Sequence, residues 1–132
     1  MGKKLMAKKQ WAMLGVAAGM LVAAQWAAAH HSLSAHYTGE KDFAVTGVAT
    51  EFVFGNPHAV VRFAVRDANG NVEQWSAETS GMRRLATAGW DKDTIKPGDR
   101  VTVIGRPSKD GSKKMFMEKI VVNGKEYERG RR

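Results

Sequence analysis

The 132-residue chain contains no cysteine and only three prolines and two tyrosines. Without cysteine it has neither disulfides nor a lipid attached through cysteine, so a domain of this size depends on its hydrophobic core alone. Gly-rich phosphate loops and a Gly-x-Ser-x-Gly elbow are also absent, and no pair of acidic residues is placed for acid–base work. We therefore do not expect an enzyme.

Residues 1–29 have the order of a secretory signal peptide. Lysines come first, an uncharged apolar run follows over Trp11–Ala24, and small residues end the segment. That run of 14 residues is shorter than the roughly 20 that a membrane-spanning helix needs, so export is favoured over a stable membrane anchor. Cleavage after Ala29 leaves Ala27 at position −3. The pattern predicts a soluble periplasmic protein that begins at His30.

Most of the positive charge lies towards the two ends of the chain. The formal net charge is +8, but residues 30–105 carry eight basic and nine acidic side chains, and the residues from Arg106 onward carry nine basic and four acidic ones. A near-neutral body with a mildly basic tail is weak evidence for a nucleic-acid partner. Because an exported protein seldom meets nucleic acid, we expect no such partner.

Downstream of the signal peptide, hydrophobic alternation and turn signals predict a β-rich domain. The expected strands cover residues 44–54, 60–66, 72–78, 100–106 and 113–122, with a short edge segment at Tyr127. Between the third and fourth strands, Ser80 is expected to cap a short helix. Met82, Leu85 and Ala86 form the apolar stripe of that helix, and Gly89 ends it.

Three strands, one short helix and two more strands follow the order of an OB-type barrel. We therefore predict a mainly β fold: a small five-stranded OB-like barrel with one short helix between strands 3 and 4, preceded by a signal-peptide helix. An open α+β sheet is the alternative, but closure hides strand edges that would otherwise template aggregation. Residues 30–43 form an N-terminal lead-in, residues 44–127 the barrel domain and residues 128–132 a basic tail.

Several short motifs are spread over the chain from His30 to Tyr127. They are His30-His31-Ser32, Asn56-Pro57-His58, Trp75, Glu78, Gly89-Trp90, the run Lys96 to Val103, Gly105-Arg106-Pro107 and Asp110-Gly111-Ser112. Together they resemble a known family, DUF6152, of small exported bacterial proteins. The resemblance spans His30 to Tyr127 and implies a periplasmic β-rich domain with no assigned activity.

The four histidines are the best candidates for a metal site. Cleavage before His30 frees an α-amino group that can chelate a transition metal together with the ring nitrogen. His31, His36 or His58 could supply the last nitrogen of a site suited to Cu(II). The alternative is that the two N-terminal histidines are a solvated terminus and that His58 is a turn residue bonded to backbone.

The stretch around His58 is the centre of the predicted domain. Gly55-Asn56-Pro57 separates two apolar runs, and proline restricts both itself and the residue before it, so the turn is stiff. Asn56, Arg62 and Trp75 are the candidate contacts for a small ligand. Strand parity also places Trp75 and Phe63 in the core.

Three functions remain open. The first is a non-catalytic periplasmic binding protein, with copper as the sharpest ligand hypothesis. The alternative is a structural or envelope protein-interaction module that uses a strand edge or the basic tail, and the third is an oligonucleotide-binding OB domain. Met115 and Met117 share a strand face and could offer thioethers to Cu(I), but they are expected to fill the core instead.

Overall fold

The computed structural model describes residues 33–130, so the predicted signal peptide lies outside the described residues. The chain divides into residues 1–35 and 36–132, and the strands and the helix α2 all belong to the second part. Within residues 33–130, no helix has the length and apolar character needed to cross a membrane. The elements are β1 (Phe43–Val53), β2 (Val60–Arg66), β3 (Val72–Glu78), α2 (Met82–Thr87), β4 (Arg100–Pro107), β5 (Lys114–Val122) and β6 (Lys125–Glu128).

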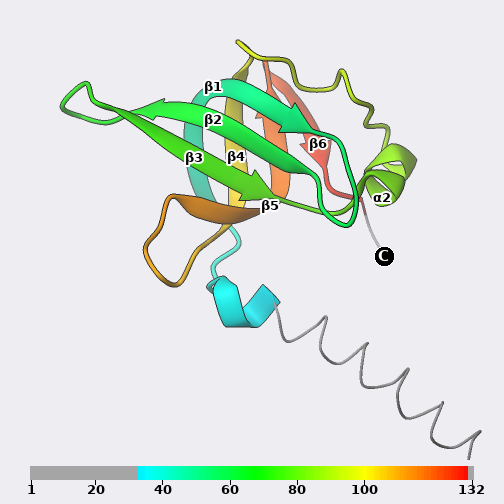
Figure 1. The fold of residues 1–132 in the computed structure, drawn as a ribbon, viewed down its shortest axis with the longest axis horizontal. Helices are drawn as coiled ribbons and strands as arrows, with labels where there is room; N and C mark the ends of the chain where they lie inside the picture. Colours follow the sequence, from blue (N-terminus) through cyan, green and yellow to red (C-terminus); the bar gives the residue numbers. More distant parts are fainter. Residues whose placement is uncertain (1–32, 131–132) are drawn as a thin grey trace, which may run out of the picture. The chain divides into compact units, whose positions relative to one another are not determined.

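The strands close into a barrel (Figure 1). Their order is β3-β2-β1-β4-β5-β6, and a further pairing joins β3 to β5. This pairing is parallel and runs over Ser76–Glu78 and Lys114–Phe116, whereas the neighbouring pairs in the order are antiparallel. The predicted five-stranded OB-like barrel with one short helix between strands 3 and 4 is confirmed, and the open sheet is wrong because β3 meets β5.

One edge of β5 is shared between two strands. Its first residues pair with β3, and its last residues, Lys119 to Val122, pair with β6, for example Ile120 with Tyr127. The short edge segment predicted at Tyr127 is therefore confirmed as β6. Between the two pairings, Met117 and Glu118 have no strand partner on that side, and their backbone carbonyls need other donors.

The core fills the barrel with aliphatic, aromatic and thioether side chains. Phe63 is fully buried, as predicted, and so are Met115 and Met117, which confirms that these methionines fill the core. Their flexible side chains suit irregular gaps between strands. The other residues of the main cluster are Val45, Ala49, Ala59, Val61, Ala77, Leu85, Trp90, Ile95, Val101, Val103, Ile120 and Val122.

The core position predicted for Trp75 is correct only in part. Its ring packs on Phe63 and Phe43, with centroid separations of 6.3 and 6.1 Å, but it is only partly buried. The reason is its place along β3, because the pairing with β5 begins one residue later, at Ser76. The side chain of Lys113 lies over the exposed part of the ring, 5.4 Å from its centroid.

A bulge breaks the alternation expected for the first strand. Ala49 faces Phe63 and Glu51 faces Arg62, so β1 has one residue more than β2 at this point. The extra residue reverses the inward and outward parity of the later residues of β1. Phe52 consequently packs against the core, whereas Thr46 and Val48, which strict alternation would place on the same face as Phe52, are exposed.

The predicted helix cap is wrong. The helix α2 begins at Met82 with Gly81 as its N-cap, and no side chain caps it. Ser80 lies two residues beyond β3, but its carbonyl still accepts a hydrogen bond from the N–H of Ala59, 3.2 Å away, which extends the contact between the two chain segments. The strand pairing therefore delays the helix by about one residue beyond the position that favours a Ser cap.

The apolar stripe expected on this helix is narrower than predicted. Leu85 is fully buried, but Met82 is 39% exposed and Ala86 is also exposed. A helix of six residues offers only one inward position per turn to the core. Gly89 follows the helix with a φ of 86°, so the predicted end is confirmed.

Candidate functional site

The turn between β1 and β2 is locked against the start of α2. The N–H of Met82 donates to the carbonyl of Gly55 at 2.9 Å, and the peptide bond between Asn56 and Pro57 is cis. A Cβ atom on Gly81 would lie 2.5 Å from Asn56 Oδ1 and 2.6 Å from the Pro57 carbonyl oxygen. Glycine is therefore required at position 81, and the turn has a fixed position on the barrel.

His58 follows this turn and faces a carboxylate on the neighbouring strand. Its Nδ1 lies 3.8 Å from Glu78 Oε2, with the two side chains 45% and 36% exposed. The pairing of Val60 with Glu78 brings His58, two residues before Val60, close to Glu78. This separation is too long for a hydrogen bond. It falls inside the range for two ligands of one metal ion, which at bond lengths of about 2.1 Å lie roughly 3.0 Å apart at a right angle and 4.2 Å apart when opposite.

Tyr37 holds the other oxygen of the same carboxylate. Its hydroxyl donates to Glu78 Oε1 at 2.8 Å, and the residue itself is only 9% exposed. Burial, followed by the hydrogen bond and the charge of Glu78, raises the pKa of the Tyr37 hydroxyl far above its usual value. The hydroxyl therefore remains a donor at any physiological pH, and Glu78 keeps one oxygen directed at His58.

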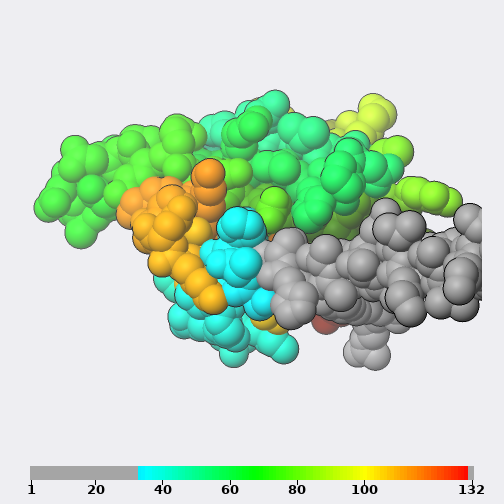
Figure 2. All heavy atoms as spheres, turned by 60° about the horizontal axis from the view of Figure 1, so that its bottom comes forward, coloured from blue at the N-terminus to red at the C-terminus, as the bar shows by residue number. Residues whose placement is uncertain are grey.

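Tyr37 is itself fixed by the loop between β4 and β5. It forms a β-bridge with Ser108, and the carbonyl of His36 accepts a hydrogen bond from the Lys109 N–H at 2.9 Å. Figure 2 shows the orange segment that contains Ser108 against the green segment that contains β3, with which the start of β5 pairs. The lead-in of the domain is thereby tied to the site that contains His58.

Only one of the other three predicted metal ligands lies within the described residues. His36 is exposed, and His30 and His31 lie outside the described residues. Within residues 33–130, no group of three or more histidine, cysteine, aspartate or glutamate side chains could hold a metal ion. The described part of the chain thus supplies a pair, His58 and Glu78, and any further ligand must come from elsewhere.

The predicted small-ligand contacts are dispersed over the molecule. Asn56 is exposed on the turn, with its side-chain oxygen near Gly81. Arg62 forms an ion pair with Glu51 across the bulged pairing of β1 and β2. Trp75 packs on the core and takes no part in the turn. These three residues do not converge on one ligand.

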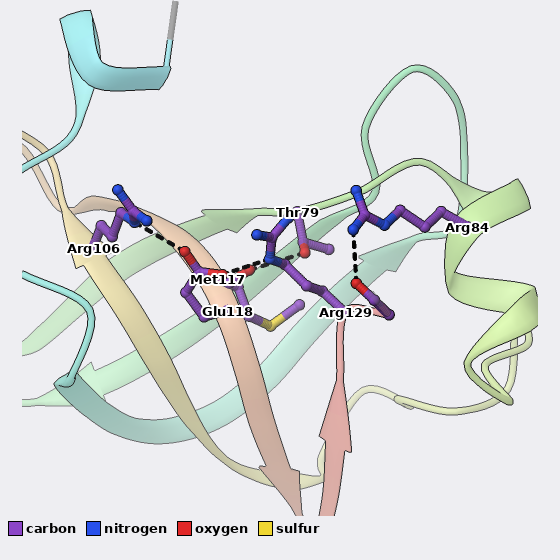
Figure 3. A network of polar contacts seen from close by, with 7 residues as sticks. Thr79, Arg84, Arg106, Met117, Glu118 and Arg129 are labelled. Carbon is purple, nitrogen blue, oxygen red and sulfur yellow. Dashed lines mark hydrogen bonds and ion pairs between the residues drawn. The ribbon is translucent and has the colours of Figure 1, made fainter. Parts of the chain in front are cut away.

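A second polar cluster lies beside β5, and we call it the β5 network (Figure 3). Glu118 accepts a hydrogen bond from Arg106 Nε at 2.9 Å and another from Arg129 Nε. Burial alone would raise the pKa of Glu118, but the bonds and charges of Arg129 and then Arg106 outweigh it and lower that pKa. All three side chains are less than a third exposed.

The β5 network also satisfies the stretch of β5 that has no strand partner. The Thr79 hydroxyl donates to the carbonyl of Met117 at 3.0 Å, and the N–H of Arg129 donates to the carbonyl of Glu118 at 3.2 Å. Arg84 donates to the carbonyl of Gly130 at 2.9 Å. The residues after β6 are therefore bound to the barrel at Arg129 and Gly130.

The hollow beside the β5 network has a volume of about 420 Å³ and includes Arg84, Glu118 and Arg129 in its wall. Charges of both signs line it, and those of Glu118 and Arg129 neutralise each other. The wall therefore presents no clear excess of one sign to a ligand. The arrangement stabilises the barrel and does not define a binding site.

The fold and its sites define a small OB-like barrel with an exposed histidine–carboxylate pair. The chain matches the DUF6152 family, a family of unknown function, over residues 10–117, and it belongs to this family. None of the curated proteins matches it. Among solved structures it is similar to the mitochondrial single-stranded DNA binding protein Rim1 of S. cerevisiae, at 10% identity and a TM-score of 0.46, over 64% of this chain and 96% of that one.

Proposed function

We propose that the protein is an exported, non-catalytic binding module of the periplasm whose ligand is a transition-metal ion, with copper first. The observation that carries the proposal is the 3.8 Å separation of His58 Nδ1 and Glu78 Oε2, both on exposed side chains. A neutral imidazole and a carboxylate are donors that Cu(II) accepts, and among divalent ions it binds such sites most strongly.

The surroundings of Glu78 support this role. Ligating carboxylates and histidines are normally oriented by a second set of hydrogen bonds, which hold them in the geometry that the metal requires. The buried hydroxyl of Tyr37 makes such a bond to Glu78 Oε1. It positions the carboxylate without occupying the oxygen that faces His58.

The remaining ligands of the proposed site come from the mature N-terminus. Export with cleavage after Ala29 would give His30 a free α-amino group, and His31 precedes Tyr37 by six residues. At most about 21 Å of chain then separates His31 from Tyr37, which contacts Glu78. The proposal therefore needs no further segment to bring an N-terminal histidine to the pair.

The test is a Cu(II) titration of protein purified from the periplasm, followed by electron paramagnetic resonance, after intact-mass measurement of its N-terminus. We expect the affinity to fall at least tenfold in His58→Ala and in Glu78→Gln. The matched control is Glu51→Gln, which also removes an exposed, ion-paired carboxylate, but from β1. It should bind copper like the wild type.

Two outcomes would overturn the proposal. If His58→Ala binds copper as tightly as the wild type, the pair is no site, and a simultaneous loss in His30→Ala would assign the ion to the terminus alone. If the protein retains Met1 to Ala29, the α-amino group of His30 does not exist and the export proposal is also lost.

The alternative functions have less support. The aromatic side chains suited to base stacking, Phe52, Phe54, Phe63 and Trp75, lie in the core or pack against it. The edge strand β6 has only four residues, three of them charged, which is a pattern that discourages pairing with another chain. Loss of a captured partner protein on removal of Arg131 and Arg132 would favour the interaction module.

A further inference from the structure

The outer face of the barrel carries a hollow that has no part in the proposed metal site. Its volume is about 340 Å³. We call it the outer groove, and it is lined by the backbone of Gly47 and by the side chains of Thr46, Val48, Ala64, Arg66, Val72 and Arg100. It shares no residue with the pair of His58 and Glu78.

The outer groove arises where β1 changes partners. Val48 faces Arg100 on β4 and Ala64 on β2. It is the last residue of β1 that pairs with β4 and the first that pairs with β2. At the neighbouring Gly47 the strands are so close that a Cβ atom would lie 2.4 Å from the Ala64 carbonyl oxygen. The floor of the groove is therefore backbone and small side chain.

The apolar part of the outer groove is exposed to solvent. Val48 is 46% exposed and Val72 is 55% exposed, two of the four exposed large hydrophobic residues within residues 33–130. Val48 faces Ala64 on β2, and Val72 on β3 faces Arg66, two residues further along β2, so these apolar side chains and Arg66 line the hollow together. Exposed apolar surface that is contiguous and bordered by polar residues is typical of a binding site.

The charged residues of the outer groove are both basic. Arg66 and Arg100 line it, and no acidic side chain does. Arg66 uses one guanidinium nitrogen for the Gly70 carbonyl, at 2.9 Å, which orients the group and leaves its other donors available. Guanidinium groups bind carboxylates through two parallel hydrogen bonds, so the groove favours an anion.

We propose that the outer groove binds an aliphatic carboxylate, namely a medium-chain fatty acid anion. The carboxylate would pair with Arg100 or Arg66 and the alkyl chain would cover Val48 and Val72. Neither a nucleotide nor a sugar suits this lining, because it contains no aromatic side chain, and the hydroxyl of Thr46 is already bonded to Thr102 at 2.8 Å. This proposal does not depend on the metal site.

The experiment uses the full mature chain with methyl-labelled valine and sodium decanoate below its micelle concentration. We expect saturable shifts of the Val48 and Val72 methyl signals, with the Val53 signal unchanged. Val53 is the matched control, because it is also on β1 and 41% exposed but lies outside the groove. Charge reversal by Arg66→Glu together with Arg100→Glu should weaken binding at least tenfold.

A control for general loss of positive charge is Arg83→Glu, an exposed position on α2 outside the groove. It should bind decanoate like the wild type. Equal weakening by Arg83→Glu, or equal shifts of Val53, would overturn the proposal. Binding to phosphatidylglycerol vesicles without binding to monomeric decanoate would also overturn it, since the surface would then contact a membrane.

Discussion

The β5 network and the pair of His58 and Glu78 are each built around one glutamate. They differ in how many oxygens of that carboxylate have a hydrogen-bond partner. Glu118 has an arginine on each carboxylate oxygen and is 20% exposed. Glu78 has a hydrogen bond on one oxygen only, and its second oxygen lies 3.8 Å from His58. The first carboxylate is saturated by the protein, and the second keeps a coordination position.

The difference indicates which cluster serves the fold. Glu118 lies where β5 passes from β3 to β6, so its arginines also secure a part of the strand that has no strand partner. A charge that is partly removed from water must be fully paired to be tolerated. Glu78 is at the end of β3, close to solvent, and incomplete pairing is tolerated there. We therefore assign the β5 network to stability and the open pair to the metal binding that we propose.

Removal of Glu118 should have the largest effect on stability. Glu118→Ala leaves Arg106 and Arg129 partly buried without a counter-charge, and we expect a loss of about 2–3 kcal/mol in the free energy of unfolding. The measurement is urea denaturation. The matched control is Glu126→Ala, which breaks the exposed ion pair with Lys119 on the same strand pair and should lose less than about 1 kcal/mol. Equal losses in the two variants would mean that the β5 network contributes no more to stability than an exposed ion pair.

Acid should break the β5 network in the same way. Because the folded state lowers the pKa of Glu118, its contribution to stability is present above the unfolded pKa of about 4.3 and is lost as the pH falls through the lower folded value. Urea midpoints measured from neutral pH downward should therefore decrease in the wild type. The decrease should be smaller in Glu118→Gln, and an identical decrease would contradict the assignment.

Loss of the Thr79 hydroxyl should have an intermediate effect. Thr79→Val keeps the shape of the side chain but leaves the buried carbonyl of Met117 without its donor, which should lower stability by about 1–3 kcal/mol. Thr79→Ser keeps the hydroxyl and should be less harmful in the same denaturation assay. If serine is the worse replacement, then packing of the methyl group, and not the hydrogen bond, is what matters at this position.

The open pair should contribute least to stability. His58→Ala removes a half-exposed side chain that makes no hydrogen bond to Glu78, and we expect a change within about 0.5 kcal/mol. Thermal unfolding without metal measures it. Added copper should raise the melting temperature of the wild type but not that of His58→Ala. A large loss without metal would show that His58 is structural.

Much of the fold can be predicted from local signals in the sequence. Asn69-Gly70 between two apolar runs indicates the hairpin of β2 and β3, and the order of strands and helix indicates the barrel. The Ser80 cap and the parity of Phe52 could not be predicted, because both depend on pairing. The Ser80 carbonyl is held by the N–H of Ala59 beyond the end of β3, and the bulge at Ala49 appears only when β1 lies on β2.

Only part of the site can be predicted from the sequence. His58 stands out because it follows a stiff turn, and the hairpin register alone pairs Val60 with Glu78 beside it. Tyr37 gives no such signal. It reaches Glu78 from a position 41 residues earlier through a bridge with Ser108, and this contact requires the closed barrel. Long-range closure also leaves Trp75 partly exposed, since β5 begins to cover β3 only at Ser76.

The pairing of β3 with β5 has a consequence for folding during synthesis at the ribosome. Phe43 pairs with Gly105 and Ser76 with Lys114, so the first strand cannot find its final neighbour until most of the chain has been made. Domains dominated by such distant contacts fold in about milliseconds to seconds. The nascent chain should therefore remain open until β5 has emerged, and that delay would favour the export that we propose, because secretion machinery engages unfolded chains.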